Sequence, residues 1–185
     1  MKFTLYSYFE KHPTQKKVAK WWSARGLPLP EALKRQLANQ IHAEMIARLM
    51  RVVVTKRSLN MQQALQSQYE LGEEIAAQTA DFLSVNPDDA RSLSSIIDFL
   101  HNLLGIHGKV EITASESEVT CHWTKCPLSA QLRESPDGSG PYYCHLYQEM
   151  YKGVIHAINP KAEANTLTTT QSMGKEFCEL KTQIG

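Results

Sequence analysis

From Pro30 onward, apolar side chains recur at every fourth position, at Leu33, Leu37, Ile41, Met45 and Leu49. Residues spaced by four lie on one face of an α-helix, so this stripe predicts a long amphipathic helix. Pro30 followed by Glu31 suits the start of that helix. Proline loses no hydrogen bond in a first turn, and an acidic residue is stabilised by the positive end of the helix dipole.

The same spacing returns twice before residue 105. A second helix is predicted over residues 60–84, where the side chain of Ser58 or Asn60 can accept a hydrogen bond from a free backbone N–H group. Gly72 lies in its middle, where glycine costs about 1 kcal/mol relative to alanine, and we interpret it as a point of close helix packing. A third apolar stripe follows at Leu93, Ile96, Ile97, Leu100, Leu103 and Leu104. Residues 1–28 show no pattern of this clarity.

The apolar period changes to two after residue 108. Residues 110–114 alternate between apolar and polar side chains, and Val119, Cys121 and Trp123 continue the alternation after a polar turn. This pattern predicts a β-hairpin. Cys121 and Trp123 are predicted to face the core, and His122 is predicted to face the other way.

One more helix and two more strands complete the chain. Pro141 can open the helix, and Asn159-Pro160 ends it, because proline disfavours a helical conformation in the residue before it. The last strands are predicted around residues 167–170 and 177–184, with a turn near residue 174.

These elements predict a single α+β domain, in which N-terminal helices are followed by two β-hairpins that bracket a helix. In this interpretation residues 1–108 are a mainly helical scaffold. Residues 109–185 form a hairpin–helix–hairpin part that carries every cysteine. A homodimer through the N-terminal helices is the assembly we expect.

Composition and charge narrow the classes of partner. Hydrophobic residues make up 42% of the chain and charged residues 21%, as in ordinary globular proteins. The net charge of +1 gives no overall field for nucleic acid or an anionic membrane, so a small-molecule ligand or substrate is the partner we expect, with no nucleic acid and no membrane. Local lysine and arginine clusters are interpreted as solvated helix faces. No run approaches ~18 apolar residues and no signal peptide is recognised, so we expect a cytoplasmic location.

Candidate chemistry centres on Cys121, Cys126, Cys144 and Cys178. Their spacings match no standard zinc motif. In a reducing compartment such cysteines serve as metal ligands, reactive thiols or core residues. Cys144 is predicted in the first turn of its helix, where the dipole stabilises a thiolate. We assign a functional role to at least two cysteines, chiefly Cys126 and Cys144, and the alternative is ordinary buried thiols.

Other candidates lie on the helix that carries Cys144. His145 and Glu149 are one turn apart, so they can form an acid–base pair or join a metal site, or they can be an exposed surface pair. Tyr147 and Tyr151, together with Trp123 of the hairpin, are predicted to line a ligand pocket. The alternative for the tyrosines is the edge of an amphipathic core.

Three motifs carry a resemblance to known families. They are Thr124-Lys125-Cys126-Pro127, the Cys144 helix that ends in Asn159-Pro160, and residues 170–178 with the sequence TQSMGKEFC. Over about residues 105–181 this order resembles the L-2-amino-thiazoline-4-carboxylic acid hydrolase-like family. It resembles more loosely the ligand-binding domains of the vinyl-4-reductase type.

The resemblance makes Cys126, Cys144 and Cys178 the family cysteines. Two departures concern the metal site: Lys175 and Gln171 stand where related families carry acidic residues, and Cys121 is an extra thiol that can replace a missing ligand. The resemblance implies a hydrolase that opens a cyclic C–N bond, with Cys126 or Cys144 as nucleophile or metal ligand and His145 or Glu149 transferring protons. A divalent metal such as zinc or manganese is the cofactor it implies. The alternative function is a non-enzymatic sensor module that binds a small ligand or a metal.

Overall fold

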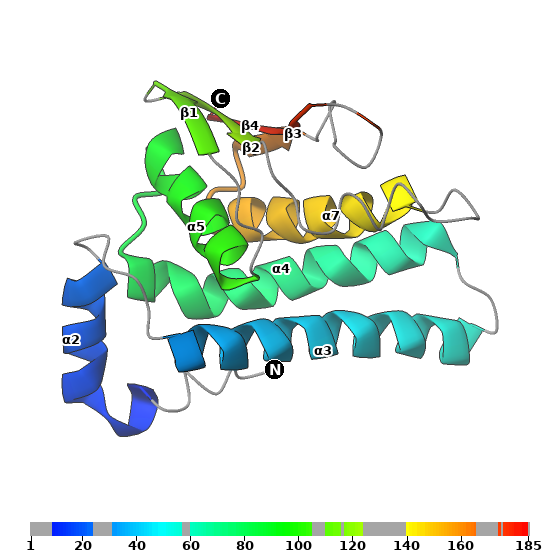
Figure 1. The fold of residues 1–185 in the computed structure, drawn as a ribbon, viewed down its shortest axis with the longest axis horizontal. Coiled ribbons are helices and arrows are strands. Elements are labelled where there is room, and N and C mark those ends of the chain that lie inside the picture. Colours follow the sequence, from blue (N-terminus) through cyan, green and yellow to red (C-terminus); the bar gives the residue numbers. More distant parts are fainter. Residues whose placement is uncertain are drawn as a thin grey trace.

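The computed structural model describes residues 9–23, 31–56, 60–104, 110–115, 117–123, 140–165, 174 and 176–184. In chain order the elements are α2 (Pro13–Ser23), α3 (Glu31–Lys56), α4 (Met61–Leu83), α5 (Ala90–Leu103), β1 (Val110–Ala114), β2 (Glu118–Trp123), α7 (Gly140–Ile158), β3 (Ala162–Asn165) and β4 (Cys178–Ile184) (Figure 1). The predicted helices are confirmed as α3, α4, α5 and α7. Helix α2 lies in the segment for which the sequence pattern gave no element.

The strands form one antiparallel sheet in the order β1-β2-β4-β3. Strands β1 and β2 make the predicted hairpin, and β3 and β4 pair after α7, so the two strand pairs bracket that helix. The α+β fold class is therefore confirmed. The strand predicted at residues 167–170 lies outside the described residues, and β3 occupies residues 162–165 instead.

The alternation along β2 is also confirmed. Val119, Cys121 and Trp123 are buried, whereas His122 is partly exposed on the other face. There His122 Nε2 lies 2.8 Å from Glu179 Oε2, its register partner on β4. The sheet is thus apolar toward the helices and polar on the other face, as expected for an antiparallel sheet covered on one side.

Helix α7 lies between the sheet and α4, and α3 packs on the far side of α4 (Figure 1). Gly72 of α4 and Gly153 of α7 permit the close approach of these two helices, because a Cβ atom at either glycine would overlap backbone atoms of the other helix. The predicted role of Gly72 in close packing is confirmed. The largest fully buried side chains come from α4, α5 and α7, with Val119 of β2, so the core lies where these helices meet the sheet.

Polar side chains fix the ends of α4 and α7. Asn60 is the N-cap of α4, and its side chain accepts a hydrogen bond of 2.9 Å from the Gln62 nitrogen. Asn159 follows α7 directly, where its Nδ2 donates to the Pro87 carbonyl at 2.8 Å and its Oδ1 accepts from the Lys161 nitrogen at 2.9 Å. The end of α7 is therefore tied to the connection between α4 and α5.

A search of the helices in the described ranges finds none that is both long and apolar enough to cross a membrane.

Candidate functional site

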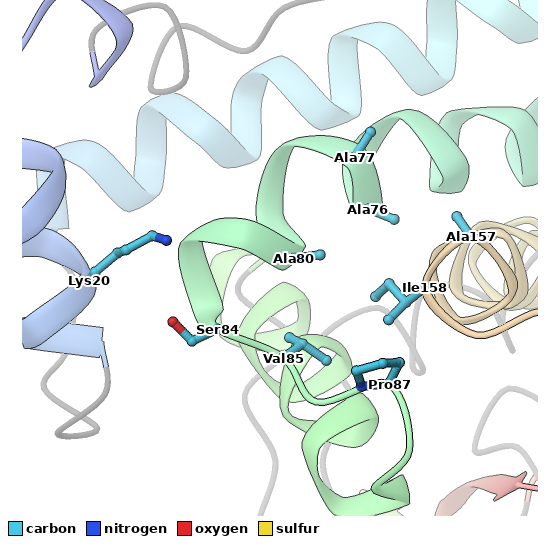
Figure 2. A pocket seen from close by; sticks show the side chains of 9 residues that line it. All are labelled: Lys20, Ala76, Ala77, Ala80, Ser84, Val85, Pro87, Ala157 and Ile158. Atoms are coloured by element: carbon cyan, nitrogen blue, oxygen red, sulfur yellow. The ribbon is translucent and has the colours of Figure 1, made fainter. Parts of the chain in front are cut away.

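The C-terminal ends of α4 and α7 form one side of an open groove of about 580 Å³ (Figure 2). The connection between α4 and α5 adds a second wall, and a lysine of α2 reaches in from the other side. The lining residues are Lys20, Ala76, Ala77, Ala80, Ser84, Val85, Pro87, Ala157 and Ile158.

Small side chains create the space. Ala76 and Ala80 face α7 from α4, and Ala157 faces them from α7 (Figure 2). The two helices approach closely at their glycines, so short alanine side chains near their C-terminal ends leave a hollow that larger residues would fill. Apart from Lys20 and Ser84 the lining is apolar. Its size and mostly apolar lining make this groove a candidate small-molecule site.

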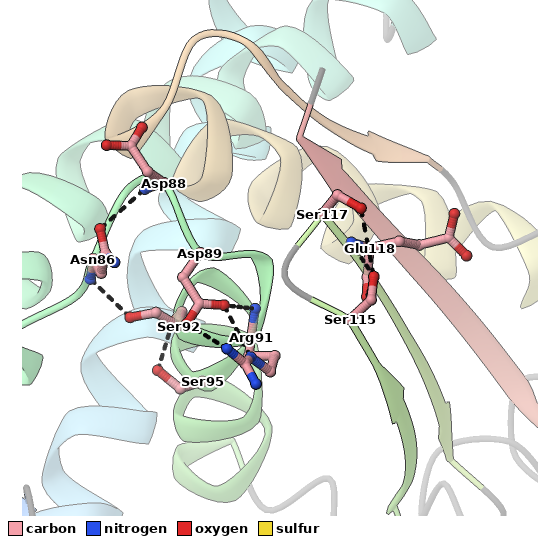
Figure 3. A network of polar contacts seen from close by, with 9 residues as sticks. All are labelled: Asn86, Asp88, Asp89, Arg91, Ser92, Ser95, Ser115, Ser117 and Glu118. Carbon is pink, nitrogen blue, oxygen red and sulfur yellow. Dashed lines mark hydrogen bonds and ion pairs between the residues drawn. The ribbon is translucent and has the colours of Figure 1, made fainter.

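The turn that forms the second wall is held by local hydrogen bonds. Ser84 has φ 54° and ends α4 in the left-handed region. Farther along, the Asn86 nitrogen donates to Ser92 Oγ at 2.7 Å, and the Arg91 nitrogen donates to Asp89 Oδ1 at 2.9 Å (Figure 3). These contacts cap α5 and link it to the turn, so local hydrogen bonds fix the shape of this wall.

A buried aromatic cluster lies elsewhere, between α5, β2 and α7. The ring centroid of His101 is 4.1 Å from that of Trp123 and 5.0 Å from that of Tyr151. Burial lowers the pKa of His101 to about 3, so its imidazole is neutral at physiological pH. Within the described part of the chain, His101 Nδ1 and Trp123 Nε1 are buried without a hydrogen-bond partner.

The three described cysteines occupy different environments. Cys121 is buried on β2, where burial and the negative charge of Asp98 raise the pKa of its thiol to about 11. Cys178 begins β4 and pairs in register with Trp123. Cys144 is partly exposed and is the fifth residue of α7, so it lies just beyond the first turn in which the helix dipole acts most strongly.

The predicted metal site has no counterpart among the residues that the structure describes. No three His, Cys, Asp or Glu side chains in those ranges gather closely enough to hold an ion. Cys126 lies outside the described residues. A site that contains it, with Cys121, Cys144 and Cys178 as further ligands and zinc or manganese as the ion, therefore stays a prediction.

The predicted acid–base residues contact other partners on the same helix. His145 Nδ1 lies 2.8 Å from Gln148 Oε1, and Glu149 Oε1 accepts a hydrogen bond of 2.6 Å from Lys152 Nζ. Tyr147 is partly buried against the core, and Tyr151 is buried in the aromatic cluster. The catalytic role of His145 and Glu149 and the ligand role of Tyr147, Tyr151 and Trp123 stay predictions.

Cys144 is far from the groove. Ala157 lies thirteen positions after Cys144 on α7, and at 1.5 Å per residue this corresponds to about 20 Å along the helix axis. Cys121 and Cys178 are on the sheet and do not line the groove either. The three described cysteines therefore lie away from the groove.

Sequence reasoning missed both the groove and His101. His101 follows Ile97 by four residues, so the helical period of α5 already places it with the buried stripe. The groove had a weaker signal, a cluster of three alanines at positions 76, 77 and 80. Only the packing of α4 against α7 brings Ala157 to face them.

The arrangement of helices over an antiparallel sheet defines the fold class, and a solved structure shares it. This is trafficking protein particle complex subunit 3 from Naegleria fowleri, covalently bound to palmitic acid. The TM-score is 0.51 at 12% sequence identity, and the match covers 84% of this chain and 97% of that one. At this identity the likeness shows the fold alone. No protein-family model and no curated protein matches the sequence.

Proposed function

We propose that this chain is a binding module that holds a small apolar ligand in the groove between the ends of α4 and α7. The groove itself carries the proposal, because its volume of about 580 Å³ and its mostly apolar lining suit such a ligand. Burial of apolar surface would supply the affinity, at roughly 25 cal/mol per Å² removed from water.

A fatty acyl chain is the first ligand class to test. The fold is similar to that of a trafficking complex subunit whose crystal structure holds palmitic acid. In that protein the acid is bound covalently. The described residues that line the groove include no cysteine, so the binding we propose for this chain is non-covalent.

Displacement of a fluorescent fatty acid by palmitic acid measures binding to the purified full-length chain. Ala77→Phe and Ala157→Phe each place a large side chain in the groove from an exposed helix position. Ala47→Phe makes the same change at an exposed position of α3, away from the groove. We expect saturable binding by the wild type and by Ala47→Phe, and at least a tenfold loss in both groove variants. Equal binding by all four proteins would place the ligand elsewhere.

Hydrolysis of a cyclic C–N bond is a second proposal, which rests on the family resemblance. The partial exposure of the Cys144 thiol, next to the exposed His145, favours it. The test is incubation with 2-amino-thiazoline-4-carboxylate, with product followed by mass spectrometry before and after metal chelation. We expect Cys144→Ser to lose turnover and keep its fold. Undiminished turnover in that variant removes Cys144 from the mechanism.

A further inference from the structure

Helix α2 concentrates positive charge. It contains Lys16, Lys17 and Lys20 and no acidic residue. The turn before it adds the exposed Lys11, against one glutamate at position 10. The whole chain has a net charge of only +1, so this short segment is much more basic than the rest.

The same helix exposes two large apolar side chains. Val18 is 55% exposed and Trp21 is 52% exposed. They are three residues apart and therefore lie on one face of the helix, and the exposed Lys17 is next to them. An exposed lysine beside two exposed apolar side chains gives this face the mixed basic and apolar character of an interfacial helix.

We propose that the outer face of α2 docks on an anionic lipid surface. The exposed Lys17 on this face and the exposed Lys11 before the helix are complementary in charge to phospholipid headgroups, and each lysine near such a surface contributes about 1 kcal/mol. A tryptophan side chain is most stable at the boundary between headgroups and acyl chains, and Val18 adds apolar area beside it.

The size of this apolar face favours lipid over a protein partner. Stable protein interfaces bury about 800 Å² on each side with matched shapes, whereas α2 offers two apolar residues on an 11-residue helix. A lipid surface requires no matching shape. The expectation of no membrane partner rested on the overall charge and on an interpretation of the local lysine clusters as solvated helix faces, and the exposed Val18 and Trp21 beside Lys17 favour the other interpretation.

Lys20 is only partly exposed and lines the groove, so it is on the side of α2 that faces the rest of the fold and not on the docking face (Figure 2). The docking itself does not depend on any ligand in the groove, so Ala77→Phe should bind vesicles as the wild type does.

The test is co-sedimentation of the full-length protein with phosphatidylcholine vesicles, with and without phosphatidylserine. We expect binding that requires phosphatidylserine and weakens as salt rises. Lys11→Gln and Lys17→Gln, both at exposed positions, should each reduce partitioning about fivefold, and Trp21→Ser with Val18→Ser should reduce it further. Two controls are Ile46→Ser, which removes an apolar residue that is 61% exposed on α3, and Lys161→Gln at an exposed turn. Both should bind as the wild type does.

Three outcomes would overturn the docking. One is equal binding to vesicles with and without phosphatidylserine. Another is a loss in Ile46→Ser as large as that in the α2 variants. The third is a protein that does not bind vesicles but self-associates in analytical ultracentrifugation, with the self-association lost in the Trp21→Ser variant. That result would assign α2 to a contact between copies of this chain.

Discussion

Gly72 of α4 and Gly153 of α7 face each other's helix backbone. A Cβ atom at Gly72 would overlap the Met150 carbonyl oxygen and lie 2.9 Å from the Val154 nitrogen. One at Gly153 would overlap the Tyr69 carbonyl oxygen. The contact is backbone to backbone, so no side chain can move aside to relieve it. The closest helix pair of the fold therefore depends on both glycines.

Alanine at either position should destabilise the protein. In an ordinary helix interior, glycine to alanine stabilises by about 1 kcal/mol. Here we expect Gly72→Ala and Gly153→Ala each to lower the free energy of unfolding by about 2–3 kcal/mol, because α4 and α7 must separate. Urea denaturation measures the change. The double variant should lose less than the sum, since one separation relieves both overlaps. A stabilised single variant would contradict the close contact.

Acid should destabilise the fold through His101. Its pKa is about 3 in the folded protein, against an ordinary value near 6.5, so between these values the unfolded chain binds a proton that the folded chain does not. Stability is therefore complete above about pH 6.5 and falls as the pH decreases toward 3. From pH 7 to pH 5 we expect His101 to account for about 2 kcal/mol.

The variant His101→Phe keeps an aromatic ring beside Trp123 and removes the titration. Its free energy of unfolding should change less between pH 7 and pH 5 than that of the wild type, as measured by urea denaturation at each pH. His42, whose pKa burial also lowers, is present in both proteins, so its effect cancels in the comparison. Identical pH profiles would show that His101 is not buried as described.

The thiol of Cys121 should be unreactive in the native protein. Burial and Asp98 raise its pKa to about 11, so the thiolate is scarce at neutral pH, and the side chain is only 4% exposed. Iodoacetamide labelling followed by peptide mass spectrometry should modify the partly exposed Cys144 and Cys178 first. Labelling of all sites in urea is the control. Rapid native labelling of Cys121 would show that β2 opens easily.

How much of this fold the sequence predicted depends on where the apolar residues point. Helices α3, α4, α5 and α7 bury their periodic stripes, and β2 buries every second residue, so period and burial agree. Helix α2 was missed because Val18 and Trp21 face solvent rather than the core. Its apolar residues follow no core-facing pattern, and its exposed face became apparent only from the structure.

The candidate site was less predictable, for a different physical reason. A groove is a shape left between elements, and the alanines of α4 meet Ala157 only after the two helices pack. Single residues with unusual chemistry are easy to recognise in a sequence, and for this reason the cysteines and His145 were predicted as site residues. Small residues that leave space are common on helices, so they attract attention only when their neighbours in space are known.

Asn159 should couple the stability of the fold to the groove. Its Nδ2 donates to the Pro87 carbonyl at 2.8 Å, between the turn and the end of α7, and the residue is only 7% exposed. Asn159→Asp keeps the oxygen that accepts from the Lys161 nitrogen and loses only the donor. The new carboxylate then faces a carbonyl oxygen, so we expect a loss of about 2 kcal/mol in the free energy of unfolding. Fatty-acid affinity should also fall, because Pro87 and Ile158 line the groove.

The matched control is Asn60→Asp, where the side chain acts only as an acceptor for the Gln62 nitrogen and aspartate caps a helix equally well. If Asn159→Asp matched this control in both urea denaturation and fatty-acid binding, the link between Asn159 and Pro87 would have no part in forming the groove.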